Sequence, residues 1–191
     1  MAEWIWYSLN EVISNIIDYR GKTPKKLGGN WSTQGYRALS ARNIKMGKIV
    51  QCESIRFVDK ALYKKWMKDE IKRRDIIITS EAPFGQIFLW DSDEKIVLSQ
   101  RLFAIRCKTE FDPYYIFFYM MTDKFQAELR GHVTGTTVIG LRQPELLKCH
   151  IFAPDYKEQR RISKVLWNIE QKIDINNRVN DNLPLEECLL A

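Results

Sequence analysis

The sequence predicts an α+β protein, with a compact mixed β/α domain followed by a long C-terminal helix of the coiled-coil type. Short runs rich in Ile, Val and Phe, separated by Gly, Asp, Ser or Pro, occupy residues 36–110 and indicate strands. Asp112-Pro113 then begins a helix, and an apolar heptad pattern covers residues 158–183. We therefore expect one domain over residues 1–154 and a long helix with a short tail over residues 155–191.

Residues 3–19 carry apolar side chains at helical spacing, which predicts a helix at the N-terminus. These apolar positions are Leu9, Val12, Ile13, Ile16 and Ile17. Ser8 or Asn10 could cap this helix, and Arg20-Gly21 could end it. A loop rich in Gly, Pro and Lys follows over residues 21–30.

The middle of the chain reads as short strands around one short helix. The expected strands cover residues 36–39, 48–51, 56–58, 75–79, 86–90, 96–98 and 103–107. The helix is expected at residues 59–68, and residues 91–95 are expected to form a hairpin turn between the strands on either side. The irregular spacing favours a mixed or antiparallel β unit over a regular βαβ alternation.

Asp112 is a good N-cap and Pro113 is favoured at the first helical position, so a helix is expected from there to about Arg130. Gly131 is expected to end it. A short helical turn at residues 144–147 and a last strand at residues 150–154 complete the expected domain.

The C-terminal helix carries its apolar residues at alternating steps of four and three. This seam consists of Ile162, Leu166, Ile169, Ile173, Asn176, Asn180 and Leu183. Such a narrow stripe has to be buried against a partner, and we favour a second chain, which would make a homodimer. Buried Asn pairs would fix the register of the two helices, and Pro184 should stop each one.

Composition narrows the class of protein. Hydrophobic residues make up 45% of the chain and aromatic residues 12%, enough for a folded core. The four cysteines form no C-x-x-C pair and the two histidines lie in no metal motif, so we expect no metal site and no cofactor in this chain. Without a secretory signal or an apolar run of membrane length, we expect a cytoplasmic protein with no membrane partner. The net charge of +6 and the pI of about 9.1 are consistent with a polyanionic partner.

No stretch makes a persuasive catalytic centre. Asp112-Pro113-Tyr114-Tyr115 is close to the D-P-P-Y box of amino-methyltransferases, but the second proline and a Gly-rich cofactor loop are missing. Asp75, Asp93 and Lys95 have the residue types of a metal-dependent nuclease. No Walker loop and no G-x-S-x-G occurs. A stand-alone DNA nuclease and a non-DNA interaction scaffold stay open as functions.

Basic and hydroxyl side chains gather on the expected loops. Lys and Arg can neutralise phosphates, and Arg and Thr can also hydrogen-bond to base edges of double-stranded DNA. The candidate DNA contacts are Lys22, Thr23, Lys25, Arg42, Lys45, Arg101, Arg130, Thr136, Thr137 and Arg142.

A series of short motifs runs in order along nearly the whole chain. They are GKTP at 21–24, YRALSARNI at 36–44, KRRDIIIT at 72–79, APFGQ at 82–86, LSQR at 98–101, TGTT at 134–137, EQRRI at 158–162 and IDINN at 173–177. Each motif is weak alone, but their order and spacing resemble the specificity (S) subunit of type I restriction–modification enzymes.

This resemblance implies a non-catalytic target recognition domain followed by a conserved-region helix. It implies partner subunits that supply the chemistry: a modification subunit that methylates adenine with S-adenosylmethionine, and a restriction subunit that uses ATP and magnesium. The usual S subunit has two recognition domains and two helices packed antiparallel, whereas this chain carries one of each, like a half-length form. A pair of such chains would read a bipartite target.

Overall fold

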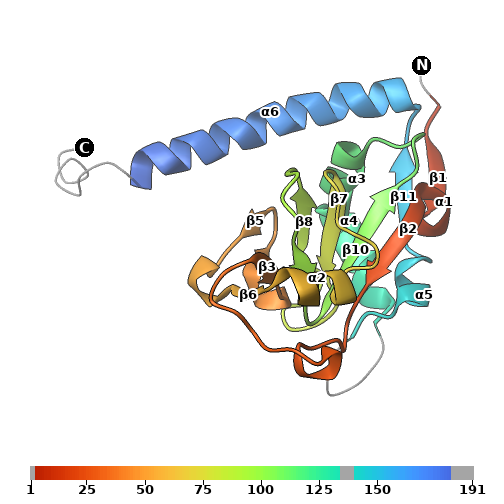
Figure 1. The fold of residues 1–191 in the computed structure, drawn as a ribbon. Helices are drawn as coiled ribbons and strands as arrows, with labels where there is room; N and C mark the ends of the chain where they lie inside the picture. Colours follow the sequence, from red (N-terminus) through yellow and green to blue (C-terminus); the bar gives the residue numbers. More distant parts are fainter. Residues whose placement is uncertain (1–2, 134–139, 182–191) are drawn as a thin grey trace.

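A four-stranded antiparallel sheet lies at the centre of the molecule, in the strand order β2-β10-β7-β8 (Figure 1). The computed structural model describes residues 3–133 and 140–181, and every side chain there except those of Arg178 and Asp181. The strands of this central sheet are β2 (Ile13–Asp18), β7 (Asp75–Thr79), β8 (Ile87–Trp90) and β10 (Leu102–Cys107). The strands predicted at 75–79, 86–90 and 103–107 are thus confirmed.

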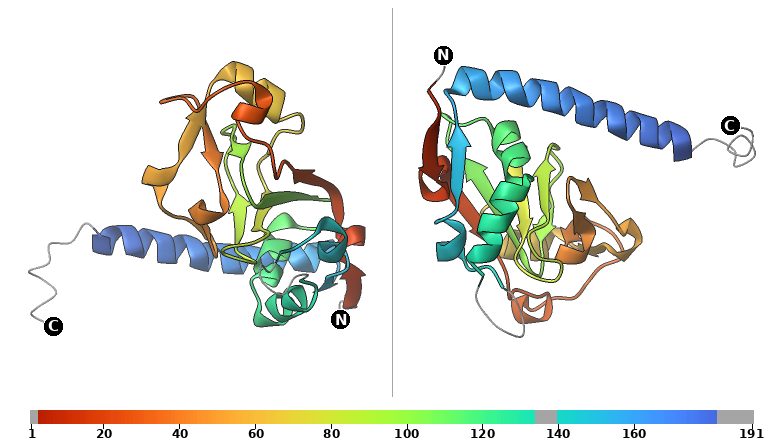
Figure 2. Two further views of the ribbon diagram at one scale, coloured as in Figure 1. Left: turned by 90° about the horizontal axis from the view of Figure 1, so that it is seen from below. Right: turned by 180° about the vertical axis from the view of Figure 1, so that it is seen from behind.

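Both faces of the central sheet are buried. On β7, Ile76 and Ile78 face one apolar cluster, and Ile77 between them faces the other. On β10, Phe103 faces the same cluster as Ile76 and Ile78, and Ala104 faces the same cluster as Ile77. A strand buried on both faces reads as a continuous apolar run, which explains the Ile76-Ile77-Ile78 sequence. The result is three layers, visible from below in Figure 2.

One outer layer consists of short strands and a helix. In a three-stranded sheet, β3 (Tyr36–Leu39) pairs antiparallel with β6 (Arg56–Val58) and parallel with β9 (Val97–Leu98). Helix α2 (Lys60–Trp66) is capped by Asp59, whose side chain accepts a hydrogen bond from the Leu62 N–H. Three 3-10 turns, η1 (Lys25–Leu27), η2 (Ala41–Asn43) and η3 (Cys52–Ser54), and the β4 (Ile44–Lys45)–β5 (Lys48–Ile49) hairpin complete this layer.

The hairpin predicted around residues 91–95 is wrong. Strand β8 pairs with β7, whereas β9 pairs with β3, so residues 91–96 cross from one sheet to the other. Local turn residues indicated a reversal of the chain, but β9 pairs with β3, a strand distant from it in sequence.

The N-terminal helix predicted over residues 3–19 is also wrong. The chain forms β1 (Ile5–Ser8), one helical turn α1 (Leu9–Val12) and then β2. Ser8 and Glu11 form a capping box that starts the turn. The β-branched residues after it suit a strand, and pairing with β10 outweighs their helical spacing. Strand β1 pairs antiparallel with β11 (His150–Ala153), the predicted last strand.

The helix predicted from Asp112 to Arg130 is two helices, α3 (Pro113–Met120) and α4 (Asp123–Gly131). Asp112 caps α3 as predicted. Thr122 interrupts the run, because its hydroxyl accepts a hydrogen bond from the Phe125 N–H and caps α4. Gly131 is the last residue of α4, and α5 (Gln143–Leu146) is the predicted short turn.

Helix α6 (Tyr156–Asp181) is the predicted long helix, and it extends past the domain in both views of Figure 2. Its first half is fixed to α3: Gln159 accepts from the Asp112 N–H, and the Ser163 hydroxyl donates to Asp112. The Trp167 ring meets Tyr114 edge-on, with 4.8 Å between ring centroids. No helix in the described residues is long and apolar enough to cross a membrane.

Candidate nucleic-acid interface

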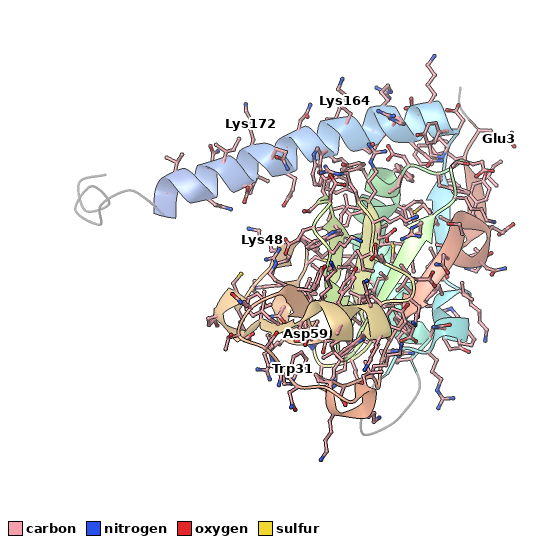
Figure 3. All side chains as sticks on the ribbon, viewed as in Figure 1. Glu3, Trp31, Lys48, Asp59, Lys164 and Lys172 are labelled. Atoms are coloured by element: carbon pink, nitrogen blue, oxygen red, sulfur yellow. The ribbon has the colours of Figure 1, made fainter. Side chains whose placement is uncertain are left out.

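A polar groove of about 410 Å³ opens between β3, β6 and the turn before β10. Its lining residues are Trp31, Ala38, Ser40, Arg42, Ser54, Arg56, Ser99 and Gln100. Figure 3 places Trp31 at the end of the domain opposite α6. Six of the eight lining residues carry polar or charged side chains, as expected of a surface that contacts a polyanion with hydrogen-bonding edges.

Backbone pairing sets the spacing of the groove walls. The parallel pair of β3 and β9 ends at Leu39 and Leu98, and beyond it the Ser99 N–H donates to the Leu39 carbonyl at 2.7 Å. The Ala41 N–H donates to the Gln100 carbonyl at 3.2 Å. These two bonds hold the segment with Ser40 beside the segment with Gln100.

The buried side chain of Asn43 joins two walls of the groove. It accepts hydrogen bonds from the N–H and hydroxyl of Ser40 and donates to the Ser54 hydroxyl at 2.9 Å. Because Asn43 is only 1% exposed, these bonds are made away from water and orient both hydroxyl-bearing segments.

Two arginines in the groove keep their hydrogen-bond donors free of acids. Arg42 and Arg56 are both exposed, and within the described residues neither forms an ion pair. By contrast, Arg37 binds Glu94 and Arg106 binds Asp75 through two nitrogens each. The Arg56 guanidinium lies 4.0 Å from the centre of the Trp31 ring. A guanidinium without a carboxylate partner can donate its fork to a phosphate or a base.

Arg101 adds positive charge next to the groove, one residue after Gln100. Its φ of 66° places it in the left-handed region, which is uncommon for a residue other than glycine. Its nearest carboxylate, that of Glu81, lies 3.7 Å away. The structure therefore brings the predicted residues Arg42 and Arg101 to the same end of the sheet.

The basic loop at residues 21–30 offers fewer free side chains for DNA contact than its sequence indicated. The Lys22 ammonium donates to the Trp66 carbonyl at 3.0 Å and lies 4.2 Å from the Tyr19 ring centre, so it holds the loop against α2. Burial lowers the pKa of Lys22, and nearby Lys68 adds to the effect. Thr23 accepts from the Lys26 N–H, and Lys25 is exposed.

The other predicted contacts lie outside the groove. Lys45 is in the β4–β5 hairpin, whose Gly47 approaches Glu170 of α6. Arg130 is in the last turn of α4, and Arg142 caps α5. Thr136 and Thr137 lie outside the described residues.

The three residues of the nuclease alternative do not form one site. Asp75 is buried against Arg106, Asp93 pairs with Arg73, and Lys95 pairs with Glu70. The part of the chain that the structure describes contains no group of three or more His, Cys, Asp or Glu that could hold a metal ion.

The predicted seam of α6 lies to one side of its contact with the domain. Each seam residue from Ile162 to Ile173 is followed directly by a residue that faces the domain. Because successive residues of a helix are about 100° apart around its axis, the seam is rotated by about 100° from that contact. Ile162 packs against the core. Ile169 and Ile173 are 51% and 45% exposed. Leu166, Asn176 and Asn180 are also exposed, and Leu183 is outside the described residues.

The model of the type I restriction modification DNA specificity domain matches residues 1–185. The chain belongs to this family. One relative is the MjaVIII type I restriction enzyme specificity subunit of Methanocaldococcus jannaschii, with 28% identity over 155 residues, which are 78% of this chain and 36% of that protein. The family assignment agrees with the motif order along the sequence and with the mixed domain followed by a long helix.

Solved structures share this fold. The HsdS subunit from Thermoanaerobacter tengcongensis matches with a TM-score of 0.64 and 17% identity, over 96% of this chain and 41% of that one. The type I S subunit from M. genitalium matches with a TM-score of 0.58 and 16% identity, over 94% of this chain and 44% of that one. This specificity-domain chain thus spans less than half the length of these relatives.

Proposed function

We propose that this chain is a non-catalytic DNA-reading subunit of a type I restriction–modification system. The observation that carries the proposal is the groove in which Arg42 and Arg56 lie beside Gln100. Neither arginine forms an ion pair with a carboxylate in the described residues. Family membership supports the same class of ligand. Base edges in the major groove of DNA offer the acceptors that Arg and Gln side chains bind in pairs of hydrogen bonds.

The chain would make two kinds of contact with DNA, one to phosphates and one to base edges. Arg101 and Lys25 are exposed on loops outside the groove lining, where they can neutralise phosphates and fix the duplex in register. The residues inside the groove would then meet base edges. The modification subunit with S-adenosylmethionine, and the restriction subunit with ATP and magnesium, would supply methylation and cleavage.

The exposed seam of α6 supports pairing of two copies. An antiparallel pair of these helices would bury Ile169 and Ile173, which the domain leaves exposed. Two recognition domains related by a twofold axis would read two inverted half-sites, which makes the proposed target bipartite and symmetric.

Binding to a labelled duplex of random sequence at several salt concentrations tests the proposal. The affinity of the chain, with and without its modification subunit, should fall steeply as salt rises. Arg101→Ala with Lys25→Ala should weaken it, because these two residues are the proposed phosphate contacts, whereas Arg160→Ala with Lys164→Ala on α6 should not. Absence of salt-dependent binding, or equal loss in both pairs, would contradict the proposal.

The nuclease alternative makes a separate prediction. If Asp75, Asp93 and Lys95 formed a metal site, plasmid DNA with added Mg²⁺ or Mn²⁺ would be cleaved by the purified chain. We expect no cleavage, because each of the three is paired elsewhere.

A further inference from the structure

Arg56 and Trp31 form a fixed pair at the rim of the groove. The Arg56 backbone is held in β6 opposite Ala38 of β3. The residue after Trp31, Ser32, donates its N–H to the Phe57 carbonyl at 2.9 Å, which ties the Trp31 segment to β6. Trp31 is half-buried, and its ring lies 6.2 Å from that of the fully buried Trp66. Both the arginine and its aromatic platform are therefore anchored through the backbone.

Stacking of this kind fixes the plane of a guanidinium and leaves its edge free. The Arg56 guanidinium carbon lies 4.0 Å from the Trp31 ring centre, which is close cation–π contact. Arg37 also lies near a tryptophan, Trp90, but its fork is already bound to Glu94. Of these two arginines, only Arg56 has an oriented fork that is available to a ligand.

We propose that Arg56 is a specificity-determining residue that reads one guanine of the target, with Trp31 as its positioning residue. Guanine presents two acceptors, O6 and N7, to the major groove, and a planar guanidinium matches them with two parallel hydrogen bonds. Preorganisation by Trp31 reduces the rotamer freedom that a free arginine would lose on binding. This inference rests on the proposed DNA-reading function.

Neighbouring groups favour a base edge over a phosphate as the partner of Arg56. Besides Arg42, the residues lining the same groove include Ser40, Ser54, Ser99 and Gln100, and all four are neutral hydrogen-bonding side chains. A mixed set of donors and acceptors suits base edges, whereas a phosphate needs donors alone. Contact of Arg56 with a phosphate is the rival outcome of the test.

Selection from a pool of randomised duplexes by the full chain with its modification subunit tests the inference. The variants are Arg56→Lys, which keeps the charge but loses the fork, and Trp31→Leu, which removes the platform. Arg160→Lys is the matched control, because Arg160 is an exposed arginine on α6 whose fork is also free of acids in the described structure. Circular dichroism checks that each variant is folded.

We expect the wild type to select a motif with a guanine at a position where Arg56→Lys has little or no preference. The loss of discrimination at that base pair should be about 5- to 150-fold, and the other positions should keep theirs. Trp31→Leu should weaken the same position, and Arg160→Lys should leave the motif unchanged.

Three other outcomes would overturn the inference, and they can be told apart. An unchanged motif in Arg56→Lys would show that Arg56 reads no base. A uniform loss of affinity with a shallower salt dependence would make Arg56 a phosphate contact. A wild-type chain that selects no motif, or binds no duplex at all, would defeat the proposed function itself.

Discussion

Replacing Arg106 by Met should destabilise the domain strongly, because it leaves the Asp75 carboxylate buried without its cation. Arg106 donates to both oxygens of Asp75, at 2.8 and 2.6 Å, and to the Glu70 carbonyl at 2.9 Å. Asp75 is 1% exposed, and in the described structure the only other hydrogen bond to its carboxylate comes from the Lys72 N–H. The ion pair also raises the pKa of Arg106 above its ordinary value.

Breaking a buried pair by removing one partner costs about 3–5 kcal/mol. The Arg106 side chain is 25% exposed, so water screens part of the interaction and we take the lower end, about 3 kcal/mol. With a urea m-value of about 2 kcal/mol/M, the unfolding midpoint should fall by about 1.5 M. Urea titration followed by circular dichroism measures this shift.

The control is Arg73→Met, because Arg73 pairs with Asp91 and Asp93 at the surface. The Arg73 and Asp93 side chains are 46% and 80% exposed, so water screens this pair and the loss should be much smaller than that of Arg106→Met. Adding Asp75→Asn to Arg106→Met removes the orphaned charge and should recover part of the stability. Equal midpoints for Arg106→Met and Arg73→Met would refute the reasoning.

Three further outcomes follow from the packing. Trp167→Ala should destabilise the domain by about 2 kcal/mol in urea, whereas Ile169→Ala should leave the unfolding of the monomer nearly unchanged and lower association in light scattering. Burial raises the pKa of the Cys149 thiol to about 12. At pH 8 it should therefore stay unmodified by iodoacetamide in the folded chain and react after unfolding, as mass spectrometry of its peptide would show. Asn43→Ala should lower stability by about 1–3 kcal/mol and weaken duplex binding in anisotropy titrations, because Ser40 and Ser54 lose their shared partner.

Sequence reasoning succeeded where a pattern depends on local rules. The Asp112 cap, the strand at residues 75–79 and the long helix all follow from local residue preferences, and the structure confirms them. It failed at residues 3–19, where pairing of β2 with β10 decides the conformation. That pairing joins segments about ninety positions apart, as Ile16 opposite Ile105 shows, and no local pattern reveals it.

The groove was only partly predictable for the same reason. Arg42 and Arg101 stood out as loop arginines, but Arg56 and Trp31 lie on different segments and are brought together by the Ser32–Phe57 bridge. Lysine is a residue type that binds phosphates, yet the Lys22 ammonium donates its hydrogen bond to the Trp66 carbonyl. Residue type thus indicated the chemistry, whereas only the fold showed which side chains are free to use it.

Methylome sequencing of cells that carry this chain with its modification subunit tests the central claim most directly. We expect adenine methylation at one bipartite motif with inverted half-sites, and loss of that motif when Arg42 and Arg56 are both replaced by Ala. Methylation at no defined motif, or a motif that survives the double replacement unchanged, would contradict the account.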